Sequence, residues 1–579
     1  FNDTYYLAGF NIITNIDMTS TTQGFVGIHV ANGNVEAGTV TGNTVGAASG
    51  VGSIKLTVGT TGGATLTGYR VGAGSNITYA NNVFGSVTTA STGTTAANIV
   101  GFMVQGGTNV SIINNTIGSL GTPNSVNASN STGSLQSVTG IQVTSGTTTL
   151  ISGNTIVNLN NNYTGTSTGL TRGIAVTASS TTIVNNTIME LSSTSQSTGT
   201  GANAAITGIV MTSTSSGAVI SGNKIHSLRI ASASAGSHVV GLFFSGSTAA
   251  HSIISKNQIH SFDIVTANTG ITLTGVDYAT GGATFSNNII RLGIKPDGTD
   301  LTTEAVVRGI SSNSSSALNN FYFNSIYIGG NGVGSTARNS FAFTRTSTSG
   351  TYDIQNNIFV NVRSNATTGG KHYALLFNSN TTGVNADYNV YYANGTGGVF
   401  ANNGSADVAT YASAWISSDV HSFFADPLFV NPTGTAANFD LHLQAGTVAE
   451  GVGIDIPSIT DDFDGDVRSG LSPTDIGADA GDFGAVGVDV GVNGLIAPTT
   501  GVCYGAAETV TVRLKNYSST QIDFAVNNVT INVSATGPAA YAGNITLNSG
   551  TLSAGATMNV TLPATINMTA AGNYVFSAS

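Results

Sequence analysis

A short motif, in which an asparagine stands two residues before an apolar residue that is usually isoleucine, recurs along most of this chain. Typical copies read INNTIGSL, SGNTIVNL, VNNTIMEL and SGNKIHSL. The asparagines are Asn43, Asn82, Asn115, Asn154, Asn186, Asn223, Asn257, Asn288, Asn324, Asn357 and Asn389, and successive copies lie 31 to 39 residues apart. A nearly fixed period of short segments is typical of repeat architectures, in which each unit packs only on its neighbours.

A second marker precedes most of these asparagines by 13 to 16 residues: a glycine, an apolar residue, any residue, and another apolar residue. Examples are Gly140-Ile-Gln-Val, Gly173-Ile-Ala-Val and Gly208-Ile-Val-Met. Both markers alternate with a period of two, which indicates strands with one inward face. No segment shows a clear helical period, and a propeller blade needs about 40–45 residues and four strands. We therefore predict a parallel β-helix over residues 1–400, with about 35 residues per coil and, at about 4.8 Å per coil, a length of roughly 50 Å.

The recurring asparagine suits a corner between two strands of such a coil. Asparagine tolerates the left-handed backbone conformation, and its amide group both donates and accepts hydrogen bonds. Stacked from coil to coil, the side chains would form an internal ladder. We predict this structural role for Asn115, Asn154, Asn186, Asn223, Asn257, Asn288, Asn324, Asn357 and Asn389.

The amino-acid composition favours β-structure and argues against several classes of function. Charged residues make up only 7% of the chain, while 40% is hydrophobic and 75 residues are glycine, a balance that favours β-structure with many turns. A net charge of −11 without a basic cluster argues against nucleic-acid binding. The single cysteine, Cys503, excludes an internal disulfide framework, and no apolar run approaches the roughly 20 residues of a membrane span.

The ends of the chain and its low charge suggest an extracellular setting. The sequence begins at Phe1 without a methionine or a signal peptide, and it stops within a strand-like pattern at Ser579. We expect a piece of a longer secreted protein. If the first coil is not capped, its open strand edges would favour end-to-end association with other copies.

The pattern changes beyond residue 400. The motifs FADPLFV (424–430), DLHLQAG (440–446), DDFDGDVR (461–468) and DIGA (475–478) follow one another without a period. From about residue 485, alternating segments at 508–516, 526–533 and 558–562 are separated by turns at the spacing of a β-sandwich. We assign 401–484 to a cap region and 485–579 to a sandwich domain.

The motifs also carry a resemblance. Residues 20–400 resemble the right-handed parallel β-helix proteins, and the motifs of 424–478 resemble the terminal module of large secreted bacterial β-helix proteins, often from Bacteroidetes; a block that usually reads SPAIDAG departs from this pattern as TVAEGVGID (447–455). Residues 485–579 resemble Ig-like or CARDB-like modules. The resemblance implies a cap that closes the last coil and export by a Bacteroidetes route such as type IX secretion. It does not define an activity, because this fold carries enzymes, adhesins and fibres alike.

Candidate metal ligands lie in the cap region. Asp462, Asp464 and Asp466 have the spacing of a calcium loop, but Val467 and Pro473 stand where an EF-hand requires glycine and glutamate. Two interpretations stay open, a bound Ca²⁺ or a turn stabilised by Asp464 and Arg468. No other cofactor is indicated.

Catalytic candidates are sparse. A polysaccharide lyase or a glycosidase needs two or more carboxylates in one site, whereas acidic residues within 20–400 are few and scattered. The most polar loop is IRLGIKPDG (290–298), for which catalysis and simple solvation are the alternatives. We assign no catalytic residue. His226 and His260 each follow a ladder asparagine by three residues, which predicts a stacked pair, while a metal site would lack a third ligand.

Two tyrosines of the late coils, Tyr327 and Tyr392, belong either to core stacks or to sugar-stacking faces.

The leading functional hypothesis is a non-catalytic, secreted or surface-exposed structural or adhesive module of a larger bacterial adhesin or fibre. Its partners would be other modules of the same chain, surface glycans or other copies of itself. The alternative is a carbohydrate-active enzyme or a glycan-binding protein that uses one side of the helix.

Overall fold

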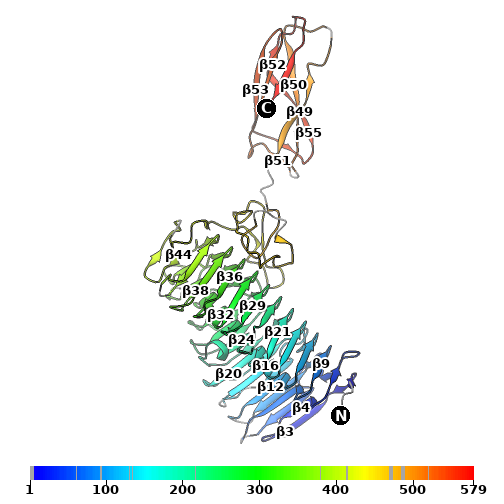
Figure 1. Cartoon of the computed structure of the whole chain (residues 1–579), viewed down its shortest axis with the longest axis vertical. Helices are drawn as coiled ribbons and strands as arrows, with labels where there is room; N and C mark the ends of the chain where they lie inside the picture. The colour runs from blue at the N-terminus through cyan, green and yellow to red at the C-terminus, as the bar shows by residue number, and fades with distance from the viewer. Residues whose placement is uncertain are drawn as a thin grey trace. The chain divides into compact units, whose positions relative to one another are not determined.

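The computed structural model describes residues 6–579 except 60–61, 92–93, 130, 133–134, 216, 335, 379, 413–414, 469–473, 484–488, 502 and 519–520. It is nearly all β-structure, with a parallel β-solenoid of about 12 turns followed by separate antiparallel sheets. The predicted fold class is therefore confirmed. Figure 1 shows the strands of successive coils lying side by side.

The first eight coils each contribute one strand to each of four sheets, called A, B, C and D in chain order, and the described residues of the later coils contribute none to sheet C. Sheet A consists of β1 (Tyr6–Ala8), β5 (Val35–Ala37), β9 (Asn76–Ala80), β13 (Asn109–Ile113), β17 (Thr148–Ser152), β21 (Ser180–Val184), β25 (Val219–Ser221), β29 (His251–Ser255), β33 (Gly282–Ser286), β36 (Asn319–Tyr322), β39 (Tyr352–Gln355) and β42 (Val384–Asp387). Sheet B consists of β2 (Ile12–Ile13), β6 (Thr44–Gly46), β10 (Val83–Gly85), β14 (Thr116–Ile117), β18 (Thr155–Val157), β22 (Thr187–Met189), β26 (Lys224–His226), β30 (Gln258–His260), β34 (Ile289–Leu292), β37 (Ser325–Ile328), β40 (Ile358–Asn361), β43 (Val390–Tyr392) and β46 (Phe423–Phe424).

The two remaining sheets complete the coils. Sheet C, which ends earlier than the others, consists of β3 (Ile16–Ser20), β7 (Ile54–Val58), β11 (Val87–Ser91), β15 (Val126–Ala128), β19 (Leu159–Asn161), β23 (Ser192–Ser193), β27 (Arg229–Ile230) and β31 (Asp263–Ile264). Sheet D consists of β4 (Phe25–Val30), β8 (Ala64–Val71), β12 (Ala97–Gln105), β16 (Leu135–Ser145), β20 (Thr168–Val176), β24 (Ile206–Met211), β28 (His238–Ser245), β32 (Thr272–Thr280), β35 (Val306–Ser312), β38 (Ser340–Arg345), β41 (His372–Phe377), β44 (Gly398–Asn402) and β45 (Asp407–Val408). A short 3-10 turn, η1 (Gly201–Asn203), interrupts this pattern once.

The core explains both sequence markers. The apolar residue two positions after each ladder asparagine points inward: Ile188, for example, pairs in register with Ile225, and both are fully buried. The marker glycine lies opposite this residue. A Cβ atom on Gly173 would lie 2.6 Å from Cγ2 of Ile188 and 2.5 Å from the carbonyl oxygen of Gly208, so only glycine lets the sheets approach this closely.

The region assigned to a cap takes two paths. Strand β45 pairs antiparallel with β44, β46 extends sheet B, and the partly buried Trp415 stacks on Phe377, with ring centroids 5.9 Å apart. Residues 407–412 and 415–424 thus cover the last coil. Residues 425–444, 448–468 and 474–481, here called the lateral segment, instead run along the side of earlier coils. They include β47 (Phe429–Asn431) and β48 (Asp440–Leu443), and they contact coils as early as Lys256. The lateral position differs from the expected end cap.

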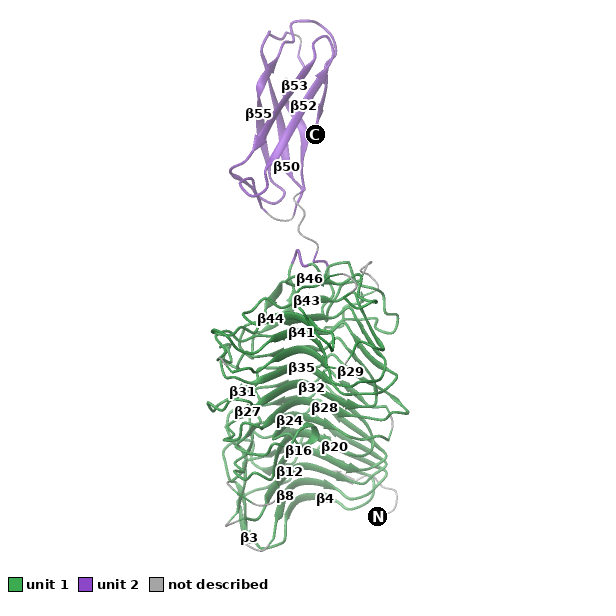
Figure 2. Ribbon diagram, turned by 90° about the vertical axis from the view of Figure 1, so that its left-hand side faces the viewer, with its two compact units in different colours: residues 1–444, 448–481 green, residues 445–447, 482–579 purple. Residues whose placement is uncertain are grey.

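The chain divides into two compact units, residues 1–444 with 448–481 and residues 445–447 with 482–579 (Figure 2). The second unit contains the antiparallel sheets β49 (Val490–Ala497)–β50 (Glu508–Asn516)–β55 (Thr557–Ile566), β53 (Tyr541–Leu547)–β52 (Val529–Thr536)–β56 (Val575–Ala578) and β51 (Ile522–Asp523)–β54 (Thr551–Leu552). Its own hydrophobic core includes Val512, Leu514, Ile531 and Val533.

Candidate functional site

The recurring asparagines form a continuous hydrogen-bonded series inside the solenoid. The Oδ1 atom of Asn186 accepts hydrogen bonds from the backbone N–H and the side-chain Nδ2 of Asn154, both at 2.9 Å. Asn186 in turn donates through Nδ2 to Oδ1 of Asn223 at 2.9 Å and to the carbonyl oxygen of Ile151 at 3.0 Å. The same Nδ2–Oδ1 bond, 2.8–3.1 Å long, links the series from Asn11 and Asn43 to Asn389.

The ladder asparagines are buried and their amides are fully used, so they offer no group to a substrate. The left-handed conformation that we assigned to them lies one residue earlier. Asn185 has a φ of 57° and Gly222 one of 66°, and each directly precedes a ladder asparagine. We assigned both roles to the ladder asparagine, but two neighbouring residues share them. The residue before the asparagine adopts the left-handed conformation at the turn, and the asparagine makes the hydrogen bonds between coils.

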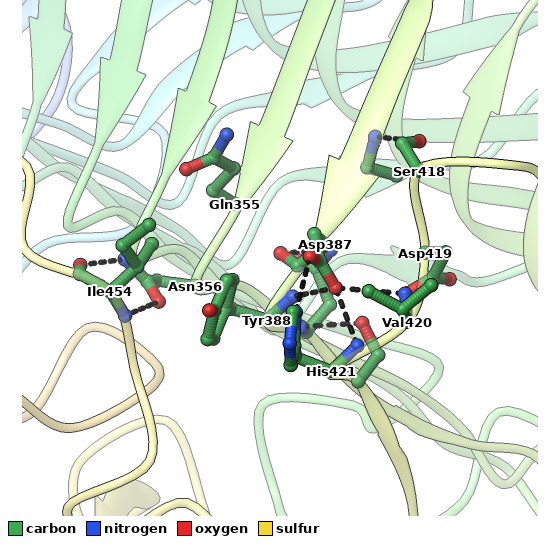
Figure 3. A network of polar contacts seen from close by, with 12 residues as sticks. Gln355, Asn356, Asp387, Tyr388, Ser418, Asp419, Val420, His421 and Ile454 are labelled. Carbon is green, nitrogen blue, oxygen red and sulfur yellow. Dashed lines mark hydrogen bonds and ion pairs between the residues drawn. The ribbon is translucent and has the colours of Figure 1, made fainter. Parts of the chain in front are cut away.

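The carboxylate at the end of the ladder is also structural (Figure 3). Oδ1 of Asp387 accepts hydrogen bonds from the backbone N–H groups of Tyr388, Val420 and His421, at 2.7–3.0 Å. Its Oδ2 lies 2.8 Å from Nδ1 of His421, whose ring stacks on that of Tyr388. Both oxygens thus fix the segment that covers the last coil.

Other acidic residues of the coils have structural partners as well. Asp353 accepts hydrogen bonds from the hydroxyl of Tyr322 at 2.6 Å and from the side-chain amides of Gln355 and Asn385 at 2.9 and 2.8 Å. Glu190 pairs with Arg229 at 3.3 Å. A carboxylate saturated in this way is a poor general base, because its lone pairs are already bonded.

The polar loop IRLGIKPDG contributes one residue, Lys295, to a depression whose other described lining residues lie outside the loop. Asp263, Lys295 and Asp300 line one depression of about 240 Å³. Burial raises the pKa of Asp263, although Arg229 and Lys295 oppose this shift. Glu304 does not line the depression and instead accepts a hydrogen bond from the backbone N–H of Thr336 at 2.9 Å. Two carboxylates therefore lie beside the lysine of the polar loop, and this is the grouping there that most resembles a catalytic site.

The proposed calcium ligands do not converge. Oδ1 of the buried Asp462 accepts hydrogen bonds from the backbone N–H groups of Asp464, Gly465 and Asp466 at 2.8–2.9 Å, and its Oδ2 accepts one from Ala480. Asp462 thus organises this turn, and Arg468 also contributes to it, because its Nε donates to the carbonyl oxygen of Asp461 at 3.3 Å.

A different group lies beside this turn: the ligand atoms of His442, Asp464 and Asp479 lie within 4.8 Å of one another. Burial lowers the pKa of His442, but the carboxylates of Asp464 and Asp440 outweigh it and raise the pKa to about 9. At neutral pH the imidazole is therefore protonated and donates to these carboxylates, with 2.6 Å between its Nε2 and Asp464, and a metal ion bound here would have to displace this proton.

The predicted histidine pair is present on the outer face of sheet B. The rings of His226 and His260 are parallel, with centroids 4.7 Å apart, and Phe439 of the lateral segment packs on His260 at 4.2 Å. Burial lowers the pKa of His226 to about 4 and that of His260 well below its ordinary value. Both rings are therefore neutral at physiological pH.

The same outward column continues through Arg291, Tyr327 and Val360 to Tyr392, one residue per coil. The lateral segment covers its middle: the guanidinium of Arg291 lies over the ring of Phe439, 4.5 Å from its centroid, and donates to the carbonyl oxygen of Gly434. Beyond this cover, Tyr327 and Tyr392 both line a groove of about 320 Å³. We call it the tyrosine groove.

The tyrosine groove has one wall that sequence reasoning missed. Asp426, Phe429 and Gln444 belong to the lateral segment and complete it. Their motifs, FADPLFV and DLHLQAG, stood out in the sequence, but nothing in them showed that this segment returns to the coils of Tyr327 and Tyr392. Tyr327 is only 8% exposed, so its ring offers no free stacking face, whereas Tyr392 is partly exposed.

A scan against protein-family models finds no match, and no curated protein or solved structure is significantly similar to the chain. Within the described residues, no helix has the length and apolar character needed to cross a membrane. The molecule is thus classified by its fold alone, as a parallel β-solenoid protein.

Proposed function

We propose that this chain is a non-catalytic, extracellular structural and adhesive module of a larger bacterial surface protein. The observation that carries the proposal is the use of the acidic side chains. Asp353, Asp387 and Asp462 each direct both carboxylate oxygens to hydrogen bonds within the protein, and the recurring asparagines are buried. These groups hold the fold together and leave the outer surface to binding.

The extracellular setting follows from the charge-poor composition, and the bacterial origin and a type IX export route rest on the resemblance of the cap motifs and of the Ig-like segment. In this setting the partners are further modules of the same chain, surface glycans and other copies of the protein. An extended stack of coils with one repeating internal ladder suits such a role, because its stability adds up coil by coil.

A cleavage screen tests the non-catalytic assignment. We expect that neutral polysaccharides and uronic-acid polymers, incubated with the protein with and without Ca²⁺, yield no new reducing ends and no unsaturated products. The control is a variant of the depression that Asp263 and Lys295 line, since this is where a catalytic carboxylate would lie. Cleavage that is lost in Asp263→Asn would show a carbohydrate-active enzyme and overturn the proposal.

A further inference from the structure

The tyrosine groove combines an apolar floor with polar groups directed at one volume. Its floor is Val360, which lies between Tyr327 and Tyr392 in the outward column of sheet B. Since the strand of Val360 lies between the strands of Tyr327 and Tyr392, and neighbouring strands are about 4.8 Å apart, the two tyrosines are about 10 Å apart. A groove of about 320 Å³ with an aromatic wall and a few polar groups is typical of small-ligand sites.

The polar groups are held in place by the protein itself. The side-chain amide of Asn394 donates to the hydroxyl of Tyr392 at 2.6 Å, and that of Gln444 donates to the carbonyl oxygen of Phe429 at 2.7 Å. The ring of Tyr327 packs edge-on against Phe429, with centroids 6.4 Å apart, which fixes its direction. Its hydroxyl makes no hydrogen bond to another described residue and so can bond a ligand.

The charges select the ligand. Asp426 is the one ionisable carboxylate among the described lining residues, and no lysine, arginine or histidine is among them. Arg291 is fully buried beside the groove, and the lateral segment accepts hydrogen bonds from its guanidinium through the carbonyl oxygens of Pro432 and Gly434. A carboxylate that has no cationic side chain beside it among the described lining residues of the groove repels anionic sugars and accepts hydrogen bonds from hydroxyl groups.

We propose that the tyrosine groove binds neutral saccharides, with the ring of Tyr392 stacking on a sugar face and the Tyr327 hydroxyl and Asp426 carboxylate bonding sugar hydroxyls. This inference names the ligand class for the adhesive role proposed above and rests on it. The groove distinguishes neutral chains from uronic-acid polymers, which carry one carboxylate on each acidic residue.

Affinity gel electrophoresis of the full chain tests the inference, with xylan, mannan and mixed-linkage β-glucan as neutral polymers and polygalacturonate and alginate as acidic ones. We expect retardation by at least one neutral polymer and by neither acidic one. Tyr392→Ala should weaken binding about tenfold, and Tyr327→Phe, which removes only a hydroxyl, about fivefold. Tyr517→Ala alters a half-exposed tyrosine of the other unit and should leave binding unchanged.

Three outcomes would contradict the saccharide assignment. No retardation by any neutral polymer, equal or stronger retardation by an acidic one, or unaltered binding in Tyr392→Ala with an unchanged Tm would overturn the saccharide assignment. Those results leave the non-catalytic function in place. Cleavage products from any polymer, in contrast, would refute the non-catalytic function while the binding data still report on the groove.

Discussion

At the scale of single residues, buried polar side chains set how this fold responds to its surroundings. Each ladder asparagine uses its amide to satisfy neighbours in the coils before and after it, so the cost of burying it is offset by several hydrogen bonds. The histidines of the outward column are different. His260 is fully buried and its Nε2 atom has no hydrogen-bond partner among the described residues, so a proton there would be strongly unfavourable.

Because burial keeps His226 and His260 in the neutral form, we predict that the folded protein loses stability in acid. The unfolded chain takes up a proton near pH 6.5, whereas burial, with a smaller effect of Lys224, holds the pKa of folded His226 at about 4. Stability is thus complete above pH 6.5 and falls as the pH drops toward 4, by about 3 kcal/mol for this residue. Thermal unfolding is measured above pH 6.5 and near pH 4. The drop in Tm between these two conditions should be smaller for a His226→Leu, His260→Leu double variant than for the parent protein. An equal drop in the variant and the parent would contradict this explanation.

At the scale of elements, separate long-range contacts hold the lateral segment to the coils, and among the described residues they do not form a continuous ladder. Arg468 makes one group of these contacts: its guanidinium donates to Oδ1 of Asn287 at 3.0 Å and to the carbonyl oxygen of Gly477 at 2.8 Å, and it lies 4.0 Å from the ring centroid of Phe323. These partners come from two coils of the solenoid and from the lateral segment itself. The side chain therefore joins the segment to the coils.

Removal of this side chain should release part of the lateral segment. In Arg468→Ala the buried acceptors lose their donor, and we expect the local free energy of opening to fall by about 2–4 kcal/mol. Hydrogen exchange of the amides in 461–468 and 474–480 should accelerate, while those of the ladder coils stay protected. Arg513→Ala, at an exposed position of the other unit, is the matched control. Unchanged exchange in Arg468→Ala would show that other contacts hold the segment.

At the scale of the whole molecule, the sequence predicts what repeats and misses what does not. The period of the asparagines and the glycine marker were sufficient for the parallel solenoid, because each coil meets only its neighbours. The path of the lateral segment was not predictable in this way: Arg468 and Asn287 are 181 residues apart, and no period relates them. The tyrosine groove was half predictable for the same reason, since Tyr327 and Tyr392 belong to the repeat and Asp426 does not.

The central claim is that the recurring asparagine holds the coils together and takes no part in chemistry. Calorimetric unfolding of an Asn186→Leu, Asn223→Leu double variant tests it most directly. We expect a lower Tm for the solenoid, with a loss on the order of 4 kcal/mol, since several buried groups lose their partners. Asn185→Gly, which keeps the left-handed turn beside the same ladder position, should leave Tm nearly unchanged. A double variant that unfolds at the parent's temperature would contradict the ladder.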